Sequence, residues 1–138
     1  MRLLLDTCVI IDWLTDADPF ERNVWDILND PDTKLYVSAE TVRELIVSFN
    51  NKKLLSKYWK NAEEMLVAMK EEAMVDILPI SERTMFTYSR LTLNEAMDHR
   101  DPSDHVIIAH AITEHITLLS SDLKFPFYRN QGLELIEY

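Results

Sequence analysis

The sequence predicts an α/β fold, a three-layer sandwich around a mostly parallel central sheet of about five strands. Short apolar runs alternate along the chain with longer segments whose apolar residues recur at helical spacing. Breaks and helix-start signals separate these segments. Because no repeat, low-complexity tract or Gly/Ser-rich linker divides the chain, we expect one domain over residues 1–138.

Five short apolar segments are the expected strands. A continuous apolar run of this length suits a strand that is buried on both faces. The third segment ends at Pro79, which cannot donate to a sheet ladder. The expected strands are residues 2–5, 34–37, 75–78, 116–119 and 133–136.

Helices are expected between these strands, at residues 9–14, 20–28, 39–49, 57–73 and 81–90, and after Asp101. Asp18 and Pro19 resemble a cap and first helical residue, and Ser81 resembles a cap. The last helix has the sharpest start, with Asp101 as the cap, a proline next and Asp104 in the first turn.

Composition excludes several classes of protein. The chain has 14 basic and 24 acidic residues, a net charge of -10 and a pI of about 4.7, which argues against a broad basic surface for nucleic acid. A hydrophobic content of 47% is too high for a disordered acidic tail. A single glycine, Gly132, rules out glycine-rich phosphate loops and with them Walker-type NTPases and Rossmann dinucleotide binders.

One cysteine, Cys8, cannot form an internal disulfide or a cysteine-rich zinc site, which fits a reducing compartment. The four histidines do not form an i, i+4 pair on a helix, which argues against zinc. The apolar start of the chain is interrupted by Asp6 and Asp12, so we do not expect a signal peptide. No apolar run approaches the roughly 20 residues of a membrane span. We expect a cytoplasmic protein with no membrane partner.

Four acidic residues stand at the ends of the expected elements. Asp6 follows the first strand and Asp122 the fourth, while Glu44 and Asp104 lie near the first turns of two helices. In a parallel sheet, functional sites lie beyond the carboxyl ends of the strands. A convergent set of carboxylates suits a hard cation such as Mg²⁺ or Mn²⁺, and such a cation suits phosphodiester hydrolysis.

Taken singly, each acid also has a structural explanation. Asp6 and Asp122 could cap the helices that follow them, and Asp104 could be a favourable acid in a first helical turn. Glu44 could be a solvated partner of a nearby arginine. The position of all four at one expected sheet edge favours the joint hypothesis.

Four segments in order carry a family resemblance: LLLDTCVIIDWL, VSAETVRELIV, HRDPSDHVIIAHAI and TLLSSDLKF. Together they resemble a PIN domain, and in particular the small single-domain toxins of the VapC type in type II toxin-antitoxin systems. The resemblance implies an endoribonuclease that depends on Mg²⁺ or Mn²⁺, with one or two ions. It also implies a homodimer that is silenced by a cognate antitoxin.

The resemblance assigns Asp6, Glu44, Asp104 and Asp122 to the metal-binding and catalytic cluster. Glu40 lies four residues before Glu44 on the same helical face, but the segment around Glu44 matches the family pattern better. Further residues are expected to support the cluster, namely Thr7, Asp101 and Ser120; Asp101 is also a cap, and Ser120 could hold Asp122 or a metal-bound water.

The sequence departs from the commoner family pattern at Cys8, Arg43 and His105. These departures bear on substrate choice rather than on activity. Cys8 is expected to be packed, although its closeness to Asp6 leaves open a sensitivity to oxidation or to soft metals. His105 is a candidate contact for substrate, with a surface role as the plainer alternative.

One stretch, residues 51–60, carries four lysines and no acid. Its lysines could hold RNA phosphates while an aromatic side chain stacks on a base, or the stretch could dock an antitoxin. A solvated helix face with core aromatics is the structural alternative. The candidate contacts are Lys52, Lys53, Lys57, Trp59 and Lys60.

Other functions remain open at this point. A housekeeping RNA-processing nuclease would have the same acids without an antitoxin. A phosphoacceptor receiver domain fits less well, because Asp6 is followed by Thr7 and Cys8 rather than by a second acid. A catalytically inactive binding module is the third alternative, and it would show no ion-dependent stabilisation.

Overall fold

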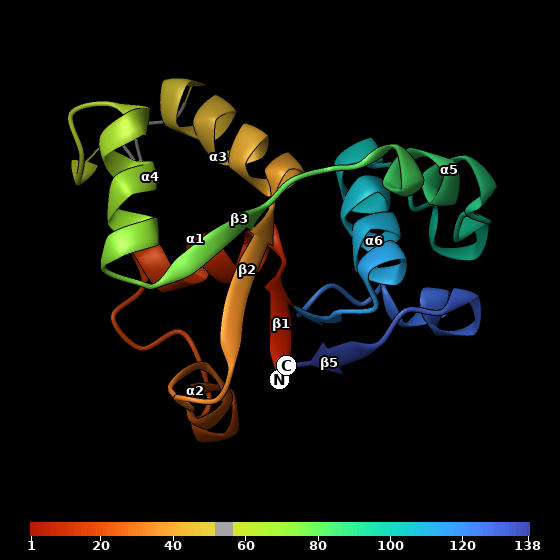
Figure 1. Ribbon diagram of the computed structural model, residues 1–138, viewed down its shortest axis with the longest axis horizontal. Coiled ribbons are helices and arrows are strands. Elements are labelled where there is room, and N and C mark those ends of the chain that lie inside the picture. Colours follow the sequence, from red (N-terminus) through yellow and green to blue (C-terminus); the bar gives the residue numbers. More distant parts are fainter. Residues whose placement is uncertain (52–56) are drawn as a thin grey trace.

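Five parallel strands form the centre of the computed structural model, which describes residues 1–51 and 57–138 (Figure 1). The strand order is β3-β2-β1-β4-β5, and every neighbouring pair is parallel. The predicted parallel α/β sheet is therefore confirmed, with strand bounds that differ from expectation by at most two residues. The strands are β1 (Arg2–Leu5), β2 (Lys34–Ser38), β3 (Val75–Leu78), β4 (Thr117–Ser120) and β5 (Leu135–Glu137).

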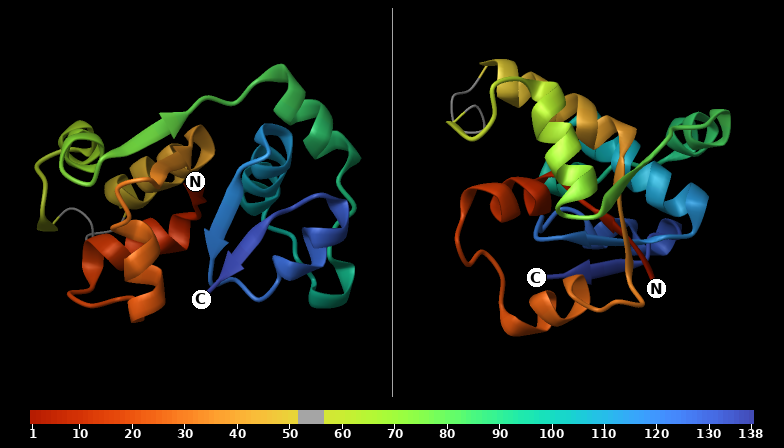
Figure 2. Two further views of the ribbon diagram at one scale, coloured as in Figure 1. Left: turned by 60° about the horizontal axis from the view of Figure 1, so that its bottom comes forward. Right: turned by 60° about the vertical axis from the view of Figure 1, so that its left-hand side comes forward.

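Helices cover both faces of the sheet (Figures 1 and 2). Side chains alternate between the faces along β1: Leu3 and Leu5 enter one apolar core, whereas Leu4 enters the other. The first core includes residues of α1 (Thr7–Thr15), α2 (Arg22–Leu28), α3 (Ala39–Asn51) and α4 (Ala62–Glu71). The second includes residues of α6 (Pro102–Glu114) and the 3₁₀ segment η3 (Pro126–Gln131). Helix α5 (Glu82–Arg90) packs on α6, and the short η2 (Glu95–Met97) follows it.

The start of α6 agrees with its sequence signal. Asp101 accepts a hydrogen bond from the backbone N–H of Ser103 at 2.9 Å, and Pro102 is the first helical residue. The helix ends at His115, which adopts the left-handed conformation. The cap formed by Asp101 fixes the first turn of α6, and it therefore places Asp104 at the carboxyl edge of the sheet.

Two helix starts differ from the prediction. Helix α2 begins at Arg22 rather than at Phe20, because Asp18 accepts a hydrogen bond from the indole N–H of Trp25 and Phe20 is buried against the same ring. Helix α4 begins at Ala62 rather than at residue 57, because the side chain of Asn61 caps it. Both segments were expected to be longer helices.

Within residues 1–51 and 57–138, none of the helices combines the length and the apolar character that crossing a bilayer requires.

Candidate active site

The four predicted acids converge at the carboxyl edge of the sheet. Strands β1 and β4 are neighbours, with Leu5 paired to Leu119, so the residues that follow them meet at one edge. Asp6 directly follows β1 and Asp122 follows β4, while α3 and α6 bring Glu44 and Asp104 to the same place. Charges on the other three acids all raise the pKa of Asp104, which places the four carboxyl groups within electrostatic range of one another.

Asp6 is buried and held by several donors. Its side chain accepts hydrogen bonds from the backbone N–H of Thr7 (2.8 Å), the hydroxyl of Ser120 (2.7 Å) and the thiol of Cys8 (3.3 Å). Burial raises the pKa of Asp6, although these hydrogen bonds oppose the shift. The carboxyl group is therefore fixed in place but has lost most of its contact with solvent.

Glu44 is held by α1 across the edge. The hydroxyl of Thr7 donates to Oε1 of Glu44 at 2.6 Å. Burial raises the pKa of Glu44, and the charges of Asp101 and Asp6 raise it further. Glu40, the alternative candidate, instead pairs with Arg43 and accepts a hydrogen bond from Ser103, so its charge is already compensated.

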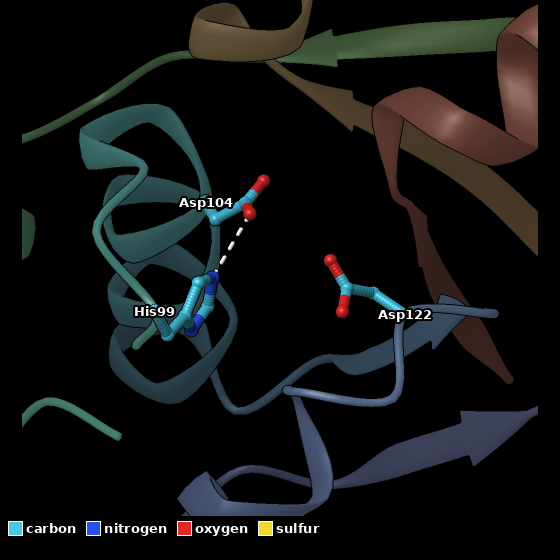
Figure 3. A group of neighbouring side chains, drawn as sticks. All are labelled: His99, Asp104 and Asp122. Carbon is cyan, nitrogen blue, oxygen red and sulfur yellow. Dashed lines mark hydrogen bonds and ion pairs between the residues drawn. The ribbon is translucent and has the colours of Figure 1, made fainter. Parts of the chain in front are cut away.

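Asp104 and Asp122 point toward one another across the site (Figure 3). Oδ2 of Asp104 lies 2.9 Å from Nε2 of His99, and burial together with the surrounding acids raises the pKa of Asp104 to about 8. Oδ1 of Asp122 accepts a hydrogen bond from the backbone N–H of Lys124 at 2.9 Å. One ligand atom from each of His99, Asp104 and Asp122 lies within 4.8 Å of the others.

Comparison with protein-family models matches residues 3–131 to the PIN domain. The chain belongs to the PIN domain family. The resemblance seen in the four sequence segments is thereby confirmed, and the family is one of nucleases. No curated protein sequence matches this PIN domain.

Solved structures share the fold over almost the whole chain. VapBC-1 from nontypeable Haemophilus influenzae aligns with a TM-score of 0.75 and 21% identity, covering 99% of this chain and 98% of that one. VapBC2 from Rickettsia felis, bound to promoter DNA, aligns with a TM-score of 0.72 and 20% identity, covering 99% of this chain and 98% of that one. VapBC-5 from Mycobacterium tuberculosis aligns with a TM-score of 0.64 and 21% identity, again covering 99% of this chain and 98% of that one.

The donor set of this PIN domain fits a hard divalent cation. Carboxylate oxygens dominate it, and Mg²⁺ and Mn²⁺ prefer oxygen ligands. Burial and mutual repulsion raise the pKa of Asp6, Glu44 and Asp104. A cation placed among them would stabilise the ionised carboxylates and so lower these pKa values. The excess of negative charge at this edge is a physical reason for it to bind a cation.

The residues expected to support the cluster do so in different ways. Ser120 donates to Asp6 and accepts from the backbone N–H of Asp122 at 3.1 Å, so it holds a different acid side chain from the one that the sequence suggested. Thr7 bridges Asp6 and Glu44 through its N–H and its hydroxyl. Asp101 caps α6, and its charge adds to the raised pKa of Glu44 and Asp104.

Two histidines differ from expectation. His105 is only 3% exposed and lies edge-on against His99, so the predicted surface position is wrong and its side chain is not available to RNA. His99 was not predicted, although it contacts Asp104. Its position five residues before Asp104 was visible in the sequence, but no periodicity or cap signal involves it.

Cys8 is packed, as expected. Burial raises the pKa of its thiol to about 11, with the charge of Asp6 as the next cause. The thiol is therefore protonated at neutral pH, which disfavours oxidation and binding of soft metals. Its role in this structure is as a donor to Asp6.

The predicted basic stretch is only partly described. Lys52 and Lys53 lie outside the described residues. Lys57 and Lys60 are exposed, whereas Trp59 is partly buried against the first apolar core. Tyr58 is 55% exposed and is the more accessible aromatic ring of the two. Contact of this stretch with RNA or with a protein partner stays a prediction.

Proposed function

We propose that this PIN domain is an endoribonuclease that uses Mg²⁺ or Mn²⁺ to hydrolyse RNA phosphodiester bonds, and that it is the toxin of a toxin-antitoxin pair. One observation carries the proposal: carboxyl groups that follow β1 and β4, and others from α3 and α6, meet at one sheet edge in a member of a nuclease family. A buried group of like charges is costly unless a cation compensates it.

The four acidic residues would have different roles in the reaction. Asp6, Asp104 and Asp122 would hold one or two cations, and Glu44 would bind a cation or position the attacking water. The cation supplies polarisation of the scissile phosphate, a lower pKa for water and stabilisation of the leaving oxygen. Thr7 holds Oε1 of Glu44, and Oε2 would be the oxygen available to the water or the cation.

Charge makes RNA binding depend on the cation. Two divalent ions add four positive charges, so the formal net charge would rise only from -10 to -6. RNA should therefore bind weakly in the absence of metal, because the phosphates meet a negative edge. Basic side chains such as Lys57 and Lys60 would provide the remaining attraction for the RNA phosphates.

The toxin assignment is supported by solved structures that share the fold, several of which are VapBC toxin-antitoxin proteins. A basic segment of an antitoxin would find the acidic edge attractive, since complementary charge favours association. We propose that this chain likewise binds a cognate antitoxin, and that it assembles as a homodimer.

Cleavage is tested by incubating total RNA with purified protein, with and without Mg²⁺ or Mn²⁺, and sequencing the new RNA ends. Wild type should cut at discrete positions only with metal, and Asp6→Asn should not cut. Asp26→Asn is the matched control, because it removes the same charge from the exposed face of α2. The nuclease proposal fails if wild type cuts no RNA with either metal.

The toxin is distinguished from a housekeeping nuclease by expression. Wild type should arrest growth, Asp104→Asn should not, and co-expression of the adjacent short reading frame should restore growth. Sequencing RNA ends after brief expression of wild type and Asp104→Asn identifies the target. A nuclease that cuts RNA in vitro but leaves growth unaffected would be evidence for the housekeeping function.

A further inference from the structure

A chain of hydrogen bonds lies directly behind Asp104. The backbone N–H of Asn94 donates to the hydroxyl of Tyr128 at 3.0 Å, and this hydroxyl lies 3.0 Å from Nδ1 of His99. Nε2 of His99 lies 2.9 Å from Oδ2 of Asp104. Asn94, His99 and Tyr128 are 3%, 2% and 0% exposed, so the chain is shielded from solvent up to the carboxyl group.

The contacts determine where the protons lie. A backbone amide can only donate, so the oxygen of Tyr128 is an acceptor toward Asn94 and its own proton is free to point elsewhere. Among the described residues, Nδ1 of His99 is the acceptor within reach of that proton. If Nδ1 carried a proton instead, the buried hydroxyl of Tyr128 would lose this acceptor, which is costly.

With the lone pair of Nδ1 facing Tyr128, the remaining ring proton lies on Nε2 and faces Asp104. We propose that His99 is a positioning residue: its Nε2–H donates to Oδ2 of Asp104, in the tautomer fixed by the hydroxyl of Tyr128, and Oδ1 is left for the cation. This inference rests on the proposed function, in which Asp104 is a ligand. Residues behind a ligand commonly orient it in this way.

One consequence concerns the choice of metal. One ring nitrogen of His99 lies within 4.8 Å of ligand atoms of Asp104 and Asp122. Nδ1 faces Tyr128, and Nε2 carries the proton in this tautomer, so it has no lone pair to offer an ion. The ligands are then all oxygens, which suits Mg²⁺ and Mn²⁺ better than Zn²⁺. The proton on His99 thus excludes the nitrogen ligand that zinc would use.

The tautomer is measured directly by long-range ¹⁵N–¹H NMR of histidine rings in the wild-type protein, first without metal and then saturated with Mg²⁺. His99→Gln assigns the signals of His99. We expect an unprotonated Nδ1 and a protonated Nε2 in both states. A proton on Nδ1, or loss of the proton from Nε2 when Mg²⁺ binds, would overturn the proposal.

Two substitutions separate positioning from packing. Glutamine can place an N–H donor where Nε2 of His99 lies, whereas leucine fills similar space without a donor. His99→Leu should weaken Mn²⁺ binding, measured by electron paramagnetic resonance, about tenfold. His99→Gln should stay within about threefold of wild type, because a restored donor recovers most of a ligand's support.

Metal-free thermal unfolding is recorded for both variants as a control for packing. Equal Mn²⁺ affinity in wild type and His99→Leu would contradict the inference, as would an equal loss in both variants. The NMR measurement uses only wild type and the assignment variant, so it tests the tautomer even if His99→Leu does not fold.

Failure of the inference and failure of the proposed function give different results. Tautomer and Mn²⁺ affinity are measured without RNA. If they agree with expectation but wild type cuts no RNA, the nuclease proposal alone fails. If wild type cuts RNA but His99→Leu binds Mn²⁺ normally, the positioning role alone fails.

Discussion

Asp6 and Asp104 lie at the same acidic edge but are held differently. Asp6 is 3% exposed and accepts hydrogen bonds from three neighbours, two of them in α1 and one at the end of β4. The side chain of Asp104 is 19% exposed, and its hydrogen-bond partner among the described residues is Nε2 of His99. Burial raises both pKa values, but hydrogen bonds oppose the shift at Asp6 whereas neighbouring acids add to it at Asp104.

The difference shows that one edge contains two kinds of carboxyl group. Asp6 is held by hydrogen bonds from α1 and from the end of β4. Burial and the charges of four neighbouring acids raise the pKa of Asp104, so we expect its charge state to respond to a cation. We expect changes at Asp6 to affect structure and activity together, and changes around Asp104 to affect metal binding first.

The largest expected effect is the loss of cleavage in Asp104→Asn. This substitution keeps the size of the side chain but removes the charge, and we expect RNA cleavage to fall by roughly 10³-fold because the cation loses a ligand. Metal-free unfolding at pH 8 should show no loss of stability, because the wild-type carboxyl group is itself half protonated there. Cleavage close to the wild-type rate would contradict a metal-binding role for Asp104.

The next effect is the pH dependence of metal binding. The pKa of Asp104 is about 8, raised from 3.8, so the cation must displace a proton at neutral pH. Mn²⁺ affinity should rise by up to about tenfold per pH unit between pH 6 and pH 8. Titrations at three pH values measure this slope, and a flat profile would mean that the carboxyl groups are already ionised.

The same pKa shift determines whether the metal-free protein gains or loses stability as the pH rises. A carboxyl group whose folded pKa is raised stabilises the protein fully below its unfolded pKa, near 4, and this contribution is lost as the pH rises through 8. Metal-free protein should therefore unfold at lower temperature at pH 8 than at pH 6, relative to Asp104→Asn, and Mg²⁺ should reduce this difference by stabilising the folded protein at pH 8.

A smaller effect is expected for Ser120→Ala. The hydroxyl of Ser120 donates to Asp6 and accepts from the backbone N–H of Asp122, so its loss leaves two groups without this partner. We expect the free energy of unfolding to fall by about 1–3 kcal/mol, measured by urea denaturation. Ser121→Ala, at the exposed neighbouring position, is the control and should change stability much less.

The smallest effect is expected for Arg43→Ala. Arg43 pairs with Glu40, and its side chain is 56% exposed, so solvent screens the interaction. We expect a loss of less than about 1 kcal/mol in the free energy of unfolding, and the loss should shrink in high salt. A larger effect would mean that the charge of Glu40, whose side chain is only 14% exposed, is costly to leave without its partner.

Much of the fold was predictable because local signals agree with it. The apolar runs of the strands and the Asp-Pro start of α6 are each determined by neighbouring residues. The start of α2 was not, because it depends on tertiary packing. Phe20 packs against Trp13 and Trp25 instead of starting a helix, since burying its ring outweighs a favourable cap. The start of α4 is set by the local cap Asn61, a signal that the expected helix over residues 57–73 did not take into account.

The candidate site was predictable to a similar degree. Parallel topology alone brings Asp6 and Asp122 to one edge, so an ordered set of acids could be inferred without coordinates. His99 could not be inferred, because no local signal places its ring between Asp104 and Tyr128, which is 29 positions further along the chain. The surface position expected for His105 failed because α6 is buried on more than one face.

The strand order also has a consequence for how the protein is made. β1 is the first strand of the chain and occupies the middle of the sheet, but its neighbour β4 comes late, and Asp6 and Ser120 are 114 positions apart. During synthesis the acids leave the ribosome in the order Asp6, Glu44, Asp104 and Asp122. Any nascent fragment that ends before β4 lacks both the last acid and the hydroxyl that holds the first. The four acids can therefore come together at one edge of the sheet only after almost the whole domain has emerged from the ribosome.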